Sequence, residues 1–281
     1  MKWLKHLLAF LVYSNLFIAC CAILMVFQSA RLLNGGDPAP ILVQFVFFAT
    51  ICSYNFHYYF TTHSLIPSPR IQWQKKNRTL LLLLFLGGAS GATICFIELR
   101  AYWPWLLPAA VATFLYSAPK LPHPVFHRLR KVAFGKTIFL AFIWMYVTTV
   151  LPYIVSGQTW NDTSTIYALS RYFFIYAICI LFDYRDREDD RAEGVRSLVT
   201  FLSDRNINRL FYFALFAYIL FTAWLGLRGF TADYLIMLFI PGIILLLLYN
   251  YARRHFTDML YYVILDGLMA LSAILMMIAG I

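Results

Sequence analysis

The stretch TLLLLLFLGGASGATICFIEL, residues 79–99, carries no charged side chain before Glu98. An α-helix needs about 20 mostly apolar residues to cross the hydrocarbon core of a bilayer, so this stretch predicts a membrane-spanning helix. The rest of the chain repeats the pattern, and we therefore expect an all-α integral membrane protein with about nine spans in a single bundle. The other expected spans cover roughly residues 7–31, 41–62, 102–117, 133–155, 164–183, 208–227, 232–251 and 259–280.

Composition excludes an ordinary soluble domain. The chain has 281 residues, of which 62% are hydrophobic and only 13% charged, whereas about a quarter of the residues in a soluble domain are charged. Much of the surface must therefore face lipid. No hydrophilic stretch is long enough to form a separate domain, so we expect residues 1–281 to form one polytopic membrane domain. The span at 102–117 is the shortest, and it contains Pro104 and Pro108.

The net charge of +10 is explained by topology and does not indicate a nucleic-acid partner. With nine spans, 19 of the 23 lysines and arginines fall on one side, and Arg31, Arg100, Arg171 and Arg228 fall on the other. Because basic residues accumulate in cytoplasmic loops, we expect a cell (inner) membrane protein with a cytoplasmic N-terminus and an external C-terminus. All five cysteines lie in apolar runs without a metal-type spacing, so we expect neither a disulfide nor a zinc site.

Six of the thirteen acidic residues fall within residues 183–193. Asp183, Asp186 and Asp190 are spaced i, i+3, i+7, so on a helix they share one face. Clustered carboxylates repel each other unless a cation neutralises them, and oxygen ligands favour Mg²⁺. Mg²⁺ commonly bridges carboxylates to phosphate oxygens, which nearby arginines also bind. The candidate arginines are Arg187, Arg191 and Arg196. The alternative interpretation is a solvated loop of Asp–Arg pairs.

The stretch DYRDREDDRAEGVRSL, residues 183–198, is similar to the second aspartate-rich motif of the UbiA superfamily of membrane prenyltransferases. Tyr116-Ser117-Ala118-Pro119-Lys120 resembles that family's tyrosine–serine–proline segment before the fifth helix. The resemblance implies a nine-helix bundle around a central cavity open toward the membrane. It also implies Mg²⁺ as cofactor, Asp183, Asp186 and Asp190 as catalytic metal ligands, and Tyr116 and Lys120 as substrate-binding residues.

The reaction implied by this resemblance starts from a prenyl diphosphate. Its carbon–oxygen bond ionises to an allylic cation, and an aromatic or otherwise membrane-soluble acceptor attacks that cation. Metal and basic residues stabilise the leaving diphosphate, and aromatic rings stabilise the cation. The expected partners are therefore a prenyl diphosphate, a lipid-soluble acceptor and the bilayer. The sequence names neither the acceptor nor the oligomeric state.

One segment departs from the family pattern. The family carries an asparagine–aspartate motif on its second helix, and here Asn55 fits the asparagine. Phe56, Tyr59 and His63 stand where the aspartates would be, so this span contributes no carboxylate. We take Asn55 and His63 as candidate substrate contacts. The alternative for His63 and for His57 is that they are packed polar residues.

Asp266 lies inside the last expected span, where a carboxylate is costly and is a functional candidate by default. The alternative is a hydrogen-bonded packing contact between helices. Two rivals to a prenyltransferase remain at this point. One is a UbiA-like homologue that binds an isoprenoid or lipid without turning it over. The other is a small transporter using Asp266 and the histidines, although the chain has no internal repeat.

Overall fold

The structure is a computed structural model that describes residues 2–61, 68–118, 135–192, 194–195 and 197–280. All of the regular elements in these ranges are helices, as the sequence predicts. The principal helices are α2 (Leu16–Asn34), α3 (Pro40–Phe60), α5 (Arg78–Glu98), α6 (Trp103–Ser117), α8 (Lys136–Met145), α10 (Asp162–Arg185), α13 (Asp204–Gly226), α14 (Ala232–Ala252) and α15 (Asp266–Ile278). Shorter helices are α1 (Lys2–Tyr13), α4 (Pro69–Lys76), α9 (Leu151–Val155), α11 (Arg187–Ala192), α12 (Leu198–Phe201) and the 3₁₀ turn η1 (Arg100–Tyr102).

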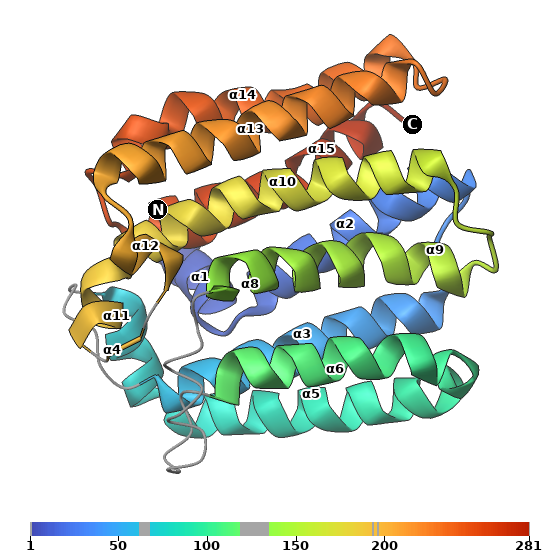
Figure 1. The fold of residues 1–281 in the computed structure, drawn as a ribbon. Helices are drawn as coiled ribbons and strands as arrows, with labels where there is room; N and C mark the ends of the chain where they lie inside the picture. Colours follow the sequence, from blue (N-terminus) through green and yellow to red (C-terminus); the bar gives the residue numbers. More distant parts are fainter. Residues whose placement is uncertain (1, 62–67, 119–134, 193, 196, 281) are drawn as a thin grey trace.

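Eight helices in the described ranges are long and apolar enough to cross a membrane. Large apolar side chains such as Leu83, Phe216 and Leu247 are exposed on their outer faces, which suits contact with lipid and not with water. The protein is therefore a multi-pass membrane protein. The remaining expected span corresponds to α6, which has 15 residues and lies beside α5 in Figure 1. The count of nine spans stays a prediction.

The start of the chain differs from the expected single span at 7–31. The helix breaks at Ser14 and Asn15, because Asn15 adopts a left-handed conformation with φ 67°. Its buried side chain donates to Asn55 Oδ1 at 3.1 Å and accepts from Arg70 Nη2 at 2.5 Å. These partners come from distant segments, which explains why the local pattern does not predict the break. The first spanning helix is thus α2, and α1 is a separate helix.

The principal helices run back and forth along one bundle direction (Figure 1). The N-terminus, α4, α11 and α12 lie at one end of the bundle, and the C-terminus lies at the other. The carboxylate-rich segment after α10 therefore shares an end with the start of α8 and the end of α3. Two stretches are π-helical, η5 (Tyr146–Val150) between α8 and α9, and η6 (Leu260–Leu265) directly before α15. Such stretches are frequent near functional sites.

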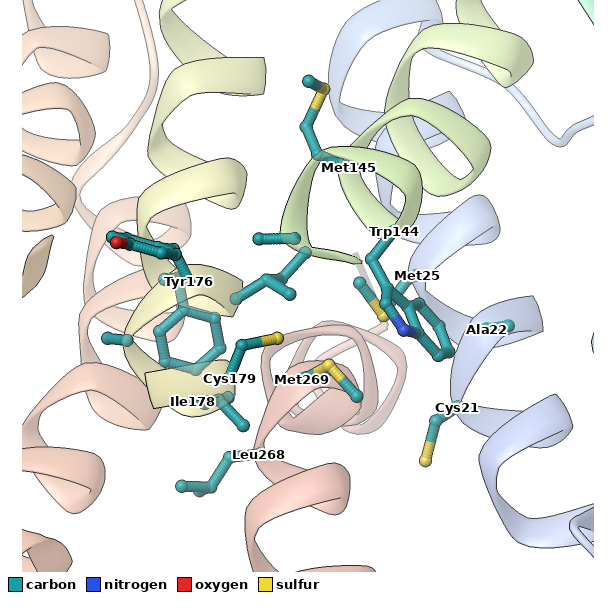
Figure 2. Packing of buried hydrophobic residues seen from close by; sticks show 14 of the residues in the cluster. Cys21, Ala22, Met25, Trp144, Met145, Tyr176, Ile178, Cys179, Leu268 and Met269 are labelled. Carbon is teal, nitrogen blue, oxygen red and sulfur yellow. The ribbon is translucent and has the colours of Figure 1, made fainter. Parts of the chain in front are cut away.

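Close helix packing forms one wall of the bundle. A Cβ atom on Gly88 of α5 would lie 2.7 Å from the backbone nitrogen of Cys52 in α3, so only glycine permits this approach. The core elsewhere is filled by apolar side chains from α2, α8, α10 and α15. Figure 2 shows Met25, Trp144, Cys179 and Met269 gathered there. This packing fixes the helices that surround the cavity described next.

Candidate active site

The bundle encloses a cavity of about 700 Å³. Pockets for small molecules and cofactors fall in the range of roughly 300–1,000 Å³, so the space suits a ligand of substantial size. Most of its wall is apolar or aromatic, including Phe45, Phe85, Phe96 and Leu106. One end is charged. The side chains there come from α8, α10 and α11 and are Lys136, Asp183, Arg185, Asp186, Asp189 and Asp190.

The three aspartates singled out by their spacing all line the charged end of the cavity. Asp183 lies in the last turn of α10, Asp186 caps that helix, and Asp190 lies in α11. Asp183 and Asp190 are each only 5% exposed, so both carboxylates are removed from bulk water. Arg185 donates to Asp186 at 2.7 and 3.2 Å. A solvated loop of Asp–Arg pairs would not bury its carboxylates to this degree.

Lys136, the first residue of α8, supplies a cation between two of these carboxylates. Its Nζ atom lies 3.4 Å from both carboxylate oxygens of Asp190 and 3.8 Å from Asp183 Oδ1. Thr137, the next residue, donates from Oγ1 to Asp183 Oδ2. Buried charges persist when they are paired. The start of α8 therefore neutralises and orients the aspartates at the end of α10.

Other expected site residues lie away from the cavity wall. Asn55 is fully buried, and its Nδ2 atom donates to the backbone carbonyls of Ser14 and Ile51. The Nη1 atom of Arg187 lies 2.6 Å from Asp204 Oδ1, and that of Arg191 lies 2.7 Å from Glu188 Oε1. His63, Lys120 and Arg196 lie outside the described residues.

Aromatic packing fills the two described positions of the altered first motif, Phe56 and Tyr59. Phe56 lines the cavity and contacts the rings of Phe60, Phe85 and Phe114. The guanidinium carbon of Arg78 lies over the ring of Tyr59, 4.5 Å from the ring centroid. Within the described part of α3, the cavity is therefore lined without a carboxylate.

His57 and Tyr116 are in contact in the cavity wall. Both line the cavity, and their rings stack with centroids 5.5 Å apart. His57 Nδ1 also lies 3.3 Å from Ser117 Oγ. The tyrosine–serine segment at the end of α6 thus meets the same part of α3 that holds the family asparagine. The two segments are brought together although 60 residues separate them in sequence.

Arg70 stands directly behind the cavity wall. It is 2% exposed, and its guanidinium lies between the rings of Tyr58 and Tyr262, 3.8 Å from each centroid. Burial alone would lower the pKa of Arg70, but Tyr58, Tyr262 and Asp266 raise it above the ordinary value. Arg70 therefore stays charged. Its backbone N–H donates to Asp258 Oδ2 at 2.7 Å, which holds α4 against the start of the last span.

Sequence reasoning missed Lys136, Arg185 and Asp189 as cavity residues. Arg185 and Asp189 lie inside the quoted acidic stretch, so the signal for them was present. Lys136 looks like any basic residue at the start of a span, which the positive-inside pattern already explains. Only the approach of α8 to the end of α10 reveals its role.

A sequence model of the UbiA prenyltransferase family matches residues 60–259. The matched segment is more than half of the chain and contains the whole carboxylate-rich end of the cavity. The chain belongs to this family. Membership of the UbiA family agrees with the all-helical membrane fold and supports a prenyltransferase-type function in general. No curated protein and no solved structure matches the chain.

The matched residues include the charged end of the cavity. The match begins at Phe60, the last residue of α3, and so excludes most of the helix that holds the altered first motif. It includes Lys136 and the aspartates from Asp183 to Asp190. The part of the chain that carries the family pattern is therefore also the part that forms the charged end of the cavity.

Proposed function

We propose that this protein transfers a prenyl group from a polyprenyl diphosphate to a membrane-soluble acceptor. The observation that carries the proposal is the division of one cavity into a charged end and an apolar body. A prenyl diphosphate has the same two parts. The diphosphate would bind at Lys136 and the aspartates, and the prenyl chain would extend along Phe45, Phe96 and Leu106.

Mg²⁺ is the cofactor expected for this reaction, and the residues present fit a metal that is shared with the substrate. In the described ranges, no three His, Cys, Asp or Glu side chains form a ready metal site. Mg²⁺ does not need one, since one or two carboxylates plus phosphate oxygens and waters usually hold it. Asp183, Asp186 and Asp190 are the proposed ligands. When bound, Mg²⁺ would neutralise negative charge on the diphosphate.

The protein's own residues account for the rest of the proposed chemistry. The bond between the prenyl carbon and the diphosphate oxygen breaks, and the electron pair leaves with the diphosphate. The ammonium group of Lys136 is already fixed where that negative charge would develop, so it requires little reorganisation. The rings of Tyr54 and Trp144, which line the cavity with centroids 6.2 Å apart, would face the allylic cation. Apolar walls exclude water, which would otherwise capture that cation.

A second candidate function is binding without turnover, and the changed first motif favours it. Phe56 occupies the cavity wall where the family has a carboxylate. A homologue that had lost one set of metal ligands would still hold an isoprenoid or its diphosphate. The two candidates differ in one measurable respect, which is consumption of the prenyl diphosphate.

The proposed orientation places the charged end of the cavity at the cytoplasmic face. It follows from the excess of lysine and arginine at the end that holds α4 and α11. In this proposal the N-terminus is cytoplasmic, the C-terminus is external, and the whole chain forms one domain in the cell (inner) membrane. A soluble or membrane-derived prenyl diphosphate would reach the site from the cytoplasmic leaflet.

A binding measurement tests the site separately from catalysis. The probe is farnesyl thiodiphosphate, in which sulfur replaces the bridging oxygen and slows ionisation. We expect it to raise the thermal midpoint of the purified protein only when Mg²⁺ is present, and we expect Asp190→Asn to need much more Mg²⁺ for the same shift. The matched control is Glu188→Gln, since Glu188 is an exposed carboxylate on the same short helix. Equal Mg²⁺ dependence in all three proteins would contradict the proposed site.

A further inference from the structure

Asp266 is a second polar group inside the cavity, separate from the charged end. It is the first residue of α15 and directly follows the π-helical segment η6. Its side chain lines the cavity, and the residue is 9% exposed. A carboxylate at this depth in a membrane protein is costly, so its retention needs a physical reason.

The carboxylate of Asp266 has no hydrogen-bond donor among the residues that the structure describes. The other buried aspartates of the cavity are satisfied. Asp183 accepts from Thr137 Oγ1, and Asp258 accepts from Ser68 Oγ at 3.0 Å and from the backbone of Arg70 at 2.7 Å. Buried carboxylates normally find such partners. The alternative considered from the sequence, a hydrogen-bonded packing contact between helices, is therefore not found for Asp266 among the described residues.

Two cations interact electrostatically with Asp266, but the hydrogen bonds that hold them are made to other residues. These cations are Arg70 and Arg185. Arg70 lies between Tyr58 and Tyr262 and donates to Asn15. Arg185 donates to Asp186 and lies 4.7 Å from the ring centroid of Tyr262. Their hydrogen bonds therefore go to other groups and not to Asp266.

The surroundings of Asp266 have the character of a pocket for a lipid-soluble molecule. Met269, one helical turn further along α15, lines the cavity together with Cys179 of α10. Figure 2 shows these two side chains next to each other in the core. Cys179 lies one helical turn before Asp183 in α10, so the wall formed by Cys179 and Met269 joins the surroundings of Asp266 to the charged end. The two polar parts of the cavity are therefore adjacent.

We propose that Asp266 forms a second subsite, which binds a neutral, lipid-soluble molecule through an O–H or N–H group. The unpaired carboxyl oxygens accept that hydrogen bond, and the apolar wall disfavours a competing anion such as a carboxylate. If the proposed function holds, on which this step rests, the molecule is the prenyl acceptor, since the Asp266 subsite adjoins the end of the cavity that would bind the diphosphate. Asp266 then determines which prenyl acceptors bind, and it orients the O–H or N–H group of the bound acceptor in the cavity.

The experiment compares two probes that differ in one hydrogen-bond donor. Protein in lipid nanodiscs is dialysed against 1-naphthol or 1-methoxynaphthalene, and empty nanodiscs give the background from lipid. We expect wild-type protein to bind 1-naphthol about tenfold more tightly, because a hydrogen bond to a buried acceptor is worth up to about that factor. Asp266→Leu should bring the ratio close to one. Asp266→Asn, which keeps a weaker acceptor and the shape, should give an intermediate ratio.

The control and the opposite outcomes keep this proposal separate from the proposed function. Met269→Leu changes the same wall without changing its polarity and should keep the wild-type ratio. A ratio near one in wild type, or an unchanged ratio in both Asp266 variants, would overturn the subsite. The same preparations are tested with farnesyl thiodiphosphate and Mg²⁺. If that probe fails to bind while the naphthol ratio behaves as expected, the Asp266 subsite stands and the prenyl diphosphate site does not.

Discussion

The Nζ atom of Lys136 lies 3.4 Å from each carboxylate oxygen of Asp190, so one partly buried ammonium is shared by both oxygens of one buried carboxylate. Asp183 Oδ1 lies 3.8 Å from the same nitrogen. In this arrangement a protein cation stands between two aspartates of the kind that hold metal in UbiA-like sites. Part of the charge that Mg²⁺ would balance is therefore balanced by the chain itself.

Removing the charge of Lys136 should destabilise the protein and increase its response to Mg²⁺. Breaking a fully buried ion pair costs about 3–5 kcal/mol. Because the Lys136 side chain is 21% exposed, we expect Lys136→Gln to cost somewhat less, about 2–3 kcal/mol. Added Mg²⁺ should restore part of this loss, since it would neutralise the freed carboxylates. Thermal unfolding with and without Mg²⁺ measures both effects.

The control for Lys136→Gln is Lys75→Gln, which removes the same charge from an exposed position on α4. It should change neither stability nor the response to Mg²⁺. A Lys136→Gln protein as stable as wild type, with no added response to Mg²⁺, would show that the lysine does not neutralise the aspartates.

The close approach of α3 and α5 gives a matched pair of stability predictions. Gly88→Ala would place a Cβ atom 2.7 Å from the backbone of Cys52, so the helices must separate. Overpacking of this kind costs about 1–3 kcal/mol. Gly87→Ala meets no atom within 4 Å and should be neutral or slightly stabilising. Denaturation of the two variants in the same detergent decides the matter, and equal stability would contradict the packing of this wall.

The orientation prediction concerns Lys75 and Ser156. They lie in segments at opposite ends of the bundle, α4 and the turn after α9 (Figure 1). In a cysteine-free background, a membrane-impermeant maleimide added outside intact cells should label Ser156→Cys and leave Lys75→Cys unlabelled. After the membrane is opened, both should react. Labelling of Lys75→Cys alone in intact cells would show the inverted orientation.

The sequence predicted the parts of this molecule that depend on local patterns. The apolar run at residues 79–99 corresponds to α5. Asp183, Asp186 and Asp190 all line the cavity, but they do not share one continuous helix face as expected, because α10 ends at Arg185 and Asp190 lies in α11. The first result needs only hydropathy, and the second needs only that acidic residues close together in sequence reach the same end of the bundle.

Features that depend on contacts between distant segments were not predictable in this way. The break at Asn15 requires Asn55 and Arg70, which lie 40 and 55 residues away. The role of Lys136 requires Asp190, 54 residues further along the chain. Asp266 was a candidate from its position alone, but its lack of a donor is a property of the packed bundle. Such facts become visible only when the helices are placed relative to one another.

In the proposed function, the charged end of the cavity activates a prenyl diphosphate. The most direct test of this claim is consumption of radiolabelled farnesyl diphosphate by purified protein in nanodiscs, with Mg²⁺ and a membrane lipid extract as the source of acceptor. We expect wild-type protein to release diphosphate and to transfer label into a lipid product. Asp190→Asn should reduce the rate by about 10²-fold or more, the effect of removing one preorganised electrostatic group, while Glu188→Gln should not change it. Release of diphosphate at the same rate by wild type and Asp190→Asn, or no release by wild type that binds farnesyl thiodiphosphate, would contradict the claim.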